Sequence, residues 1–330
     1  MVTLPPGLGV RVRVPASSAN LGPGFDAIGL ALGVWDDYQA RVGGDGLRIE
    51  VSGQGADQVP RDQRHLVYRC LVRGLEVLGC APPAGVELLC TNRVPHSRGM
   101  GSSATAAVAG FALACAWASA ASGSAQARSE GAARARDDVP LDLDLINELA
   151  AQAEGHPDNS SASVYGGMTV SWSDDPGAMT GVHTARVAVH PDVVPLVLVP
   201  DMELSTAAAR AALPTDLPLK AASLNAGRAA LLVEAMTRDP RLLLPATRDW
   251  LHQEARRIAY PATMRVVDAL RAQGAAAVVS GAGPTVLVLT TAADLDRDRA
   301  LAEQVTSGES ARWRVGTPGI PAAGVTASVA

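Results

Sequence analysis

The sequence predicts a two-domain α+β protein, on the basis of its length, its hydrophobic content and a pattern of strands and helices that begins again midway. The chain has 330 residues, of which 48% are hydrophobic and 18% are charged. This is enough for one large or two ordinary domains, each with its own core. After about residue 180 strand-like and helical segments start anew, which is typical of a separate second domain.

The first half combines short strands with amphipathic helices. Residues 10–14, VRVRV, alternate apolar and charged side chains, as a half-buried strand does. Segments 36–42 and 47–53 are strand-like and flank GGDG, and this spacing predicts a hairpin. Further along, the pattern predicts strands at 85–95 and 166–175, and helices at 65–79, after the Gly–Ser loop near residue 100, and at 142–155.

The second half has the same mixture. Residues 184–200 are strand-like, and residues 275–290 predict a strand, a turn and a second strand. Helical patterns cover 205–213, 221–236 and 262–274. These elements would form the second α+β domain.

Composition argues against several classes of function. The net charge of −5 disfavours a nucleic acid or an anionic membrane as the main partner. The four cysteines show no metal-binding spacing, and we interpret them as reduced core residues of a cytoplasmic protein. No signal-peptide pattern begins the chain. The apolar stretch 104–121 approaches the length of a membrane span, but its many alanines favour a buried helix.

A glycine–serine loop, Gly99 to Ser103, precedes this long helix. A helix N-terminus offers free N–H groups and a partial positive charge to an anion, and glycines let the backbone approach a phosphate closely. The same residues fit an ordinary turn with serine caps. Because Lys220 is the only lysine, a phosphate here would be held by backbone, serine and metal, and a P-loop is excluded.

Three other stretches concentrate polar residues or glycines. His156, Asp158 and Asn159 follow a predicted helix end and fit either a turn or a polar binding site. Asn20 and Asp26 frame a Gly-Pro-Gly turn, and a Gly-x-Gly-Pro turn lies between the two apolar strands of 275–290. The low-complexity stretch 118–140 is interpreted as a solvated helical extension or a mobile loop outside any site.

The order of these stretches along the chain resembles the GHMP kinase superfamily, and within it the homoserine kinases. The resemblance spans residues 11 to about 290. It is carried by PASSANLGPGFD (15–26), PHSRGMGSSA (95–104), HPDNSSASVYGG (156–167), STAAARAALP (205–214), LHQEARRIAYP (251–261) and SGAGPT (280–285). The first and fourth of these favour homoserine kinases over their relatives.

The resemblance implies an N-terminal, ATP-binding domain over residues 1–175, of the ribosomal protein S5 domain 2-like type, and a ferredoxin-like domain over 176–330. ATP and Mg²⁺ would bind in the cleft between them. The implied reaction is the phosphorylation of L-homoserine in threonine biosynthesis. The implied enzyme is cytoplasmic, with no nucleic-acid or membrane partner, and a homodimer is the expected assembly.

The resemblance also implies roles for individual residues. ATP would be bound by Pro95, Arg98, Gly99, Met100, Gly101, Ser102, Ser103 and His65, the last standing where many relatives have asparagine. Ser103 and Glu148 would bind the metal, with Glu154 as the alternative. The substrate would contact Asn20, Asp26, His156, Asn159, Arg210, Arg256, Gly281 and Gly283. In this set the two arginines would bind the carboxylate, and Asp26 the ammonium group.

Asn159, His156 and Arg210 would be the catalytic residues. Asparagine cannot act as a base, so the resemblance implies catalysis by positioning and charge stabilisation, with the hydroxyl proton passing to the γ-phosphate. His156 and Asp158 are the candidates if a base exists. Another kinase of the superfamily, or an inactive nucleotide-binding regulator, remains an alternative. A Rossmann protein is disfavoured, because the third glycine of its motif is missing.

Overall fold

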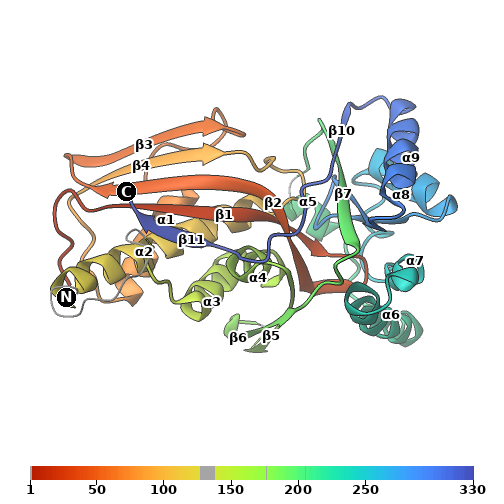
Figure 1. Ribbon diagram of the computed structural model, residues 1–330, viewed down its shortest axis with the longest axis horizontal. Coiled ribbons are helices and arrows are strands. Elements are labelled where there is room, and N and C mark those ends of the chain that lie inside the picture. Colours follow the sequence, from red (N-terminus) through yellow and green to blue (C-terminus); the bar gives the residue numbers. More distant parts are fainter. Residues whose placement is uncertain (1, 127–137, 176, 205) are drawn as a thin grey trace.

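Two β-sheets with helices packed on them build the protein (Figure 1). The computed structural model describes residues 2–126, 138–175, 177–204 and 206–330. One sheet has seven strands and the other has four. The predicted α+β class is therefore confirmed.

The larger sheet has the order β11-β1-β2-β4-β3, and β5 extends it by pairing with both β2 and β6. Its strands are β1 (Gly9–Asn20), β2 (Gly24–Val42), β3 (Gly46–Gly53), β4 (Gly85–Asn92), β5 (Met168–Asp175), β6 (Thr180–Val187) and β11 (Thr326–Val329). The alternation predicted for residues 10–14 is confirmed: the valines are buried and the arginines are exposed. The larger sheet also contains β6 and β11, which both lie after residue 175 in the chain. The predicted domain boundary at 175 therefore does not divide the chain into one sheet for each domain.

The hairpin predicted around GGDG is wrong. β4 lies between β2 and β3, antiparallel to the first and parallel to the second. The Gly43 N–H donates to the Gly85 carbonyl, and a Cβ on Gly85 would lie 2.0 Å from the Gly44 oxygen. The glycines thus let the chain cross closely over the start of β4 instead of turning back on β2.

Four helices pack on this sheet and on one another: α1 (Leu66–Val77), α2 (Ser102–Gln126), α3 (Leu143–Glu154) and α4 (Asp158–Tyr165). The 102–122 part of α2 is long and apolar enough to cross a membrane, yet 72% of its most apolar window is buried inside the protein. Phe111 and Trp117 are fully buried there. α2 is therefore the buried helix that its alanines predicted. It continues to Gln126, and the rest of the 118–140 interpretation falls largely on residues 127–137, outside the described residues.

The smaller sheet has the antiparallel order β10-β7-β9-β8. Its strands are β7 (Val193–Pro200), β8 (Ala276–Val279), β9 (Val286–Thr291) and β10 (Trp313–Gly316), accompanied by α5 (Thr206–Ala211), α6 (Leu219–Thr237), a 3-10 helix (Pro240–Leu242), α7 (Leu243–Ala246), α8 (Pro261–Ala272) and α9 (Leu295–Ser307). The single strand-like run 184–200 is in fact parts of two strands in different sheets, separated by residues 188–192.

One hydrophobic cluster contains residues of both sheets, among them Leu30 of β2 and Val197 of β7. The two halves of the molecule therefore share part of their core. This shared core fixes the relative position of the loops that meet above it.

Candidate active site

A cavity of about 510 Å³ lies where loops of the two sheets meet. Its walls come from the turn after β1, the loop before α2, the start of α4, the region around α5 and the turn between β8 and β9. Thirteen of the predicted site residues line it. These are Asn20, Asp26, His65, Arg98, Gly99, Gly101, Ser102, Ser103, His156, Asn159, Arg210, Arg256 and Gly281.

Four predicted site residues do not line this cavity: Pro95, Met100, Glu148 and Gly283. The side chain of Met100 is 1% exposed and packs in the shared core, so only its backbone belongs to the loop. Gly283 follows the lining residues Gly281 and Ala282 and bonds back to the Ser280 carbonyl.

The glycine–serine loop presses against the turn between β8 and β9. Gly99 has a φ of 74°, and a Cβ there would lie 2.3 Å from the Ser280 carbonyl oxygen. The Ser280 hydroxyl donates to the Gly99 carbonyl at 2.6 Å. Two glycine-containing motifs that are far apart in sequence thus meet in a single contact, and Gly99 is needed for that close approach.

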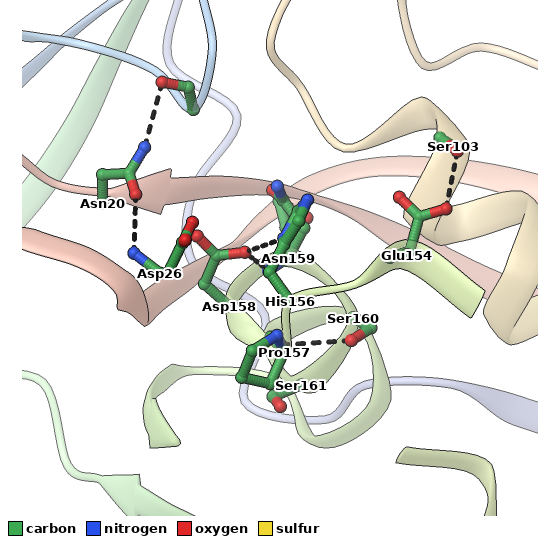
Figure 2. A network of polar contacts seen from close by, with 12 residues as sticks. Asn20, Asp26, Ser103, Glu154, His156, Pro157, Asp158, Asn159, Ser160 and Ser161 are labelled. Atoms are coloured by element: carbon green, nitrogen blue, oxygen red, sulfur yellow. Dashed lines mark hydrogen bonds and ion pairs between the residues drawn. The ribbon is translucent and has the colours of Figure 1, made fainter. Parts of the chain in front are cut away.

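The two serines at the start of α2 have different partners. The Ser102 hydroxyl lies 3.0 Å from Nδ1 of His96, within the loop itself. The Ser103 hydroxyl donates to Oε1 of Glu154 at 2.7 Å (Figure 2). Burial raises the pKa of the Glu154 carboxyl, against the effect of the Ser103 hydrogen bond. A serine hydroxyl and a half-buried carboxylate thus lie together at the helix N-terminus.

Glu148, the first choice for a metal-binding glutamate, is not placed beside Ser103. α3 ends at Glu154, where Gly155 takes the left-handed conformation. Residues six apart on a helix point about 120° away from each other, so Glu148 and Glu154 lie on different faces of α3. Glu148 instead accepts a hydrogen bond from Gln152 at 3.2 Å.

His156, Asp158 and Asn159 form a compact group at the start of α4 (Figure 2). Oδ1 of Asp158 lies 2.6 Å from Nδ1 of His156 and accepts the Asn159 N–H at 2.7 Å. Burial opposes the charged forms, but the attraction between the two groups outweighs it. The pKa of His156 is therefore raised and the pKa of Asp158 lowered. The predicted helix end is confirmed, because Gly155 caps α3. His156, Asp158 and Asn159 line the cavity, and their role in binding stays a prediction.

Charged groups of both signs adjoin this group in the cavity wall: one side-chain atom each of Asp26, His156 and Asp158 lie within 4.8 Å of one another. Arg210 bonds Asp26 through both guanidinium NH groups, at 2.8 and 3.2 Å. Arg256 is 2% exposed, donates from Nε to the Ala209 carbonyl and contacts Nδ1 of His252. A wall with an acid and two arginines suits a ligand that carries both an ammonium group and a carboxylate.

Three further cavity residues differ in their hydrogen bonding: two of them bridge segments of the chain, and the third is His65. The Asn20 amide donates to the Gly281 carbonyl at 3.0 Å and accepts from the Asp26 N–H, so it joins the two loops (Figure 2). The Arg98 guanidinium donates to the carbonyls of Pro200 and Asp201, which ties the loop to the end of β7, and to the His96 carbonyl within the loop itself. His65 is buried, and among the described residues its Nδ1 has no hydrogen-bond partner. Burial and the nearby His96 lower the pKa of His65.

Sequence reasoning missed two buried residues that support the loop. Asp36 is 1% exposed; it accepts from the Val94 N–H at 2.9 Å and from the Thr105 hydroxyl at 3.3 Å, so it ties the two ends of the loop together. Ser17 contacts Asn159. Ser17 lies inside a quoted motif, but only its spatial neighbours reveal a role. No local signal marks Asp36.

Comparison with known proteins identifies the family and the fold of the chain. The family model for the GHMP kinases N terminal domain matches residues 65–167, and the model for the GHMP kinases C terminal domain matches residues 221–308. The crystal structure of homoserine kinase from Cytophaga hutchinsonii superimposes with a TM-score of 0.78 at 24% identity, covering 97% of each chain. A crystal structure of mevalonate kinase gives 0.61 at 13% identity, covering 94% of this chain and 99% of that one.

Two curated relatives are named homoserine kinase. The one from Streptomyces avermitilis is 47% identical over 293 residues, 89% of each chain. The one from Rhodococcus erythropolis is 49% identical over 294 residues, 88% of each chain. The chain belongs to the GHMP kinases, and within them to the homoserine kinase family. The resemblance noted from the sequence motifs is thereby confirmed.

Proposed function

We propose that this kinase transfers the γ-phosphoryl group of ATP to the hydroxyl of L-homoserine, giving O-phospho-L-homoserine and ADP for threonine biosynthesis. The observation that carries the proposal is the pairing of Arg210 with Asp26 in the cavity that also exposes the glycine–serine loop. An amino-acid alcohol needs a cation for its carboxylate and an anion for its ammonium group. Mevalonate and sugars lack the ammonium group and have no need of Asp26.

ATP would place its phosphates on the loop from Gly99 to Ser103. Backbone N–H groups of the first turn of α2 and the helix dipole favour an anion there. His65 would lie beside the base, because it lines the same cavity and its Nδ1 is without a partner among the described residues. Arg98 would act indirectly, by holding the loop to the second domain.

The residues present fit a magnesium ion. Mg²⁺ prefers oxygen ligands, and the Ser103 hydroxyl and the Glu154 carboxylate offer two of them at the helix N-terminus. Glu154 replaces Glu148 in this role. When bound, Mg²⁺ neutralises charge on the β- and γ-phosphates as the phosphoryl group leaves.

No side chain has to remove the hydroxyl proton. Asn159 cannot accept a proton, and Asp158 raises the pKa of His156, which favours the charged form of the imidazole over the free base. The loose transition state of phosphoryl transfer asks little of a base, so the proton would pass directly to a γ-phosphoryl oxygen. His156 and Arg210 would stabilise the developing negative charge, while Asn159 positions the hydroxyl.

Direct detection of the product tests this proposal. Purified protein is incubated with Mg-ATP and L-homoserine, and the products are identified by phosphorus NMR and mass spectrometry. The proposal expects O-phospho-L-homoserine and ADP in equal amounts. Inorganic phosphate with no phosphoamino acid would contradict it. Binding of ATP without any turnover would instead favour the inactive regulator.

We also propose a cellular location and an assembly for the enzyme. Cys70, Cys80, Cys90 and Cys115 are buried and free, which suits a reducing cytoplasm. The acidic balance of the chain gives no reason to add a nucleic acid or a membrane as partner. A twofold homodimer is the assembly we propose, since closed dimers are the commonest oligomers of soluble enzymes.

A further inference from the structure

Ser17 lies directly beneath the glycine–serine loop and contacts Asn159. It belongs to β1 and is fully buried. Its hydroxyl donates to Oδ1 of Asn159 at 3.0 Å, and its backbone N–H donates to the Met100 carbonyl at 3.2 Å. One residue is thus bonded both to the loop proposed to hold ATP and to the side chain proposed to hold the acceptor hydroxyl.

Gly101 leaves the space through which Ser17 reaches Asn159. Its φ is 71°, and a Cβ there would lie 2.2 Å from the Ser17 hydroxyl oxygen and 3.2 Å from Oδ1 of Asn159. Any side chain at 101 would displace the hydroxyl or the amide. This glycine therefore serves the Ser17–Asn159 contact as well as the loop.

A second hydroxyl, that of Ser163, completes the hydrogen bonds around Ser17. Ser163, on α4 with Asn159, donates to the Ser17 oxygen at 3.3 Å. A hydroxyl has one proton to give. The Ser17 oxygen accepts from Ser163, and the buried Ser17 proton has Oδ1 of Asn159, at 3.0 Å, as its acceptor among the described residues; an NH₂ group in that place would leave this proton without an acceptor. The Asn159 amide is therefore fixed with Oδ1 toward Ser17.

The consequence concerns the acceptor hydroxyl. Asn159 lines the cavity, and with Oδ1 engaged by Ser17 its NH₂ group is the end left to bind a ligand. An N–H donor occupies a lone pair of the substrate hydroxyl oxygen and leaves the proton of that hydroxyl free to point at a phosphoryl oxygen. A reversed amide would instead accept that proton and compete with the phosphoryl group for it.

We propose that Ser17 is a positioning residue for phosphoryl transfer, which fixes the orientation of the Asn159 amide and its distance from the nucleotide loop. The inference rests on the proposed function, since it assigns Asn159 to the acceptor hydroxyl. Ser17 itself contacts neither substrate nor metal and acts through Asn159 alone.

A double-mutant cycle tests it. Ser17→Ala, Asn159→Ala and the double variant are compared for kcat, for KM of each substrate and for ADP affinity. We expect Ser17→Ala to lower kcat by about 10- to 100-fold, because small misplacement of a positioned group costs that much, while ADP affinity changes less than about twofold. In the Asn159→Ala background, Ser17→Ala should cause no further loss of kcat.

Ser161→Ala is the matched control. Ser161 is a fully buried serine of the same helix, but its hydroxyl bonds Asn147 and Thr184 and not the loop. Its kcat should stay within about twofold of the wild-type value. An unchanged kcat in Ser17→Ala, a loss that multiplies with that of Asn159→Ala, or an equal loss in Ser161→Ala would each overturn the inference.

Wild-type turnover separates this inference from the proposed function. If the wild-type protein does not phosphorylate L-homoserine but does phosphorylate another alcohol, the proposed substrate fails and the cycle is run with that alcohol. If wild-type turnover of L-homoserine is present and the cycle shows no coupling, only the role of Ser17 fails.

Discussion

Arg210 and Asp26 form a two-pronged ion pair across the wall of the cavity, with N–O distances of 2.8 and 3.2 Å, although they are 184 residues apart in the chain. Asp26 lies near the start of β2, and Arg210 lies on the short helix α5. A zwitterionic ligand that enters the cavity can exchange this internal pair for two new ones, carboxylate to arginine and ammonium to aspartate. A ligand with only one charge would leave one member of the pair without its partner.

Neutralising Asp26 should weaken substrate binding selectively. We expect Asp26→Asn to raise KM for L-homoserine by about 10- to 100-fold, the usual cost of losing a charge-assisted hydrogen bond, with KM for ATP nearly unchanged. Steady-state kinetics with each substrate varied in turn gives both values. Asp239→Asn is the control, because Asp239 forms a comparable pair with Arg241 outside the cavity wall. Equal effects of the two variants would argue against a role for Asp26 in binding.

The two glutamates of α3 should differ in their effect on metal dependence. We expect Glu154→Gln to lower kcat at least about tenfold and to raise the Mg²⁺ concentration required for half-maximal rate, since it removes a charged oxygen ligand. Glu148→Gln, on the same helix but bonded to Gln152, should behave as wild type. Titration of the rate with Mg²⁺ distinguishes them. A larger shift in Glu148→Gln would restore the first assignment.

The pH dependence of kcat should reveal whether His156 acts as a cation or as a base. Asp158 raises the pKa of His156 above its ordinary value, so the imidazolium persists to higher pH than in a free histidine. A cationic role predicts that kcat falls as the pH rises through the raised pKa, and that His156→Gln removes this limb of the profile. A base would give the opposite slope.

The His156–Asp158 pair should also make the free energy of unfolding depend on pH, in the acid range and near neutral pH. A raised histidine pKa stabilises the folded state below about pH 6.5, the ordinary value, and this contribution is lost as the pH rises through the raised pKa. The lowered pKa of Asp158 stabilises the folded state above its ordinary value, and that contribution is lost in acid. Urea unfolding of wild type and of His156→Gln across this range should converge at high pH. A constant difference between them at all pH values would contradict the ion pair.

A methyl group on Gly99 should disturb both folding and nucleotide binding. Its Cβ would lie 2.3 Å from the Ser280 carbonyl oxygen at a left-handed φ, so we expect Gly99→Ala to lower the free energy of unfolding by about 1–3 kcal/mol and to weaken ADP binding. Gly227→Ala in α6 is the control, because nothing lies within 4 Å of its added Cβ and its helical position favours alanine. Urea unfolding and ADP titration measure the two effects. An unperturbed Gly99→Ala would show that the loop does not require this contact.

Local patterns predicted most of the elements, because alternation in β1 and helical spacing in α3 depend only on neighbouring residues. The placement of β4 between β2 and β3 could not be predicted in this way, since the turn glycines carry no information about a strand forty residues further on. The identity of the glutamate beside Ser103 depends on which face of α3 meets α2. The stop signal at Gly155 was visible, but the packing of the two helices was not.

The same limit applies to the candidate site: local motifs predict some of its residues, whereas contacts between distant residues are not visible in the sequence. The motifs predicted that Asn20, Asp26 and Asn159 would lie together, and the structure brings all three to one cavity. Supporting residues escaped notice because their partners are distant in sequence: Ser17 and Asn159 are 142 residues apart. A buried serine in a polar motif has no local property that distinguishes it from a capping residue.

The most direct test of the central claim is ADP release by the purified protein with Mg-ATP and L-homoserine, measured beside L-threonine, mevalonate, galactose and shikimate. The arrangement of Asp26, Arg210 and the glycine–serine loop predicts rapid release with L-homoserine and little with the others. Turnover of another alcohol in preference to L-homoserine, or of none of them, would contradict it.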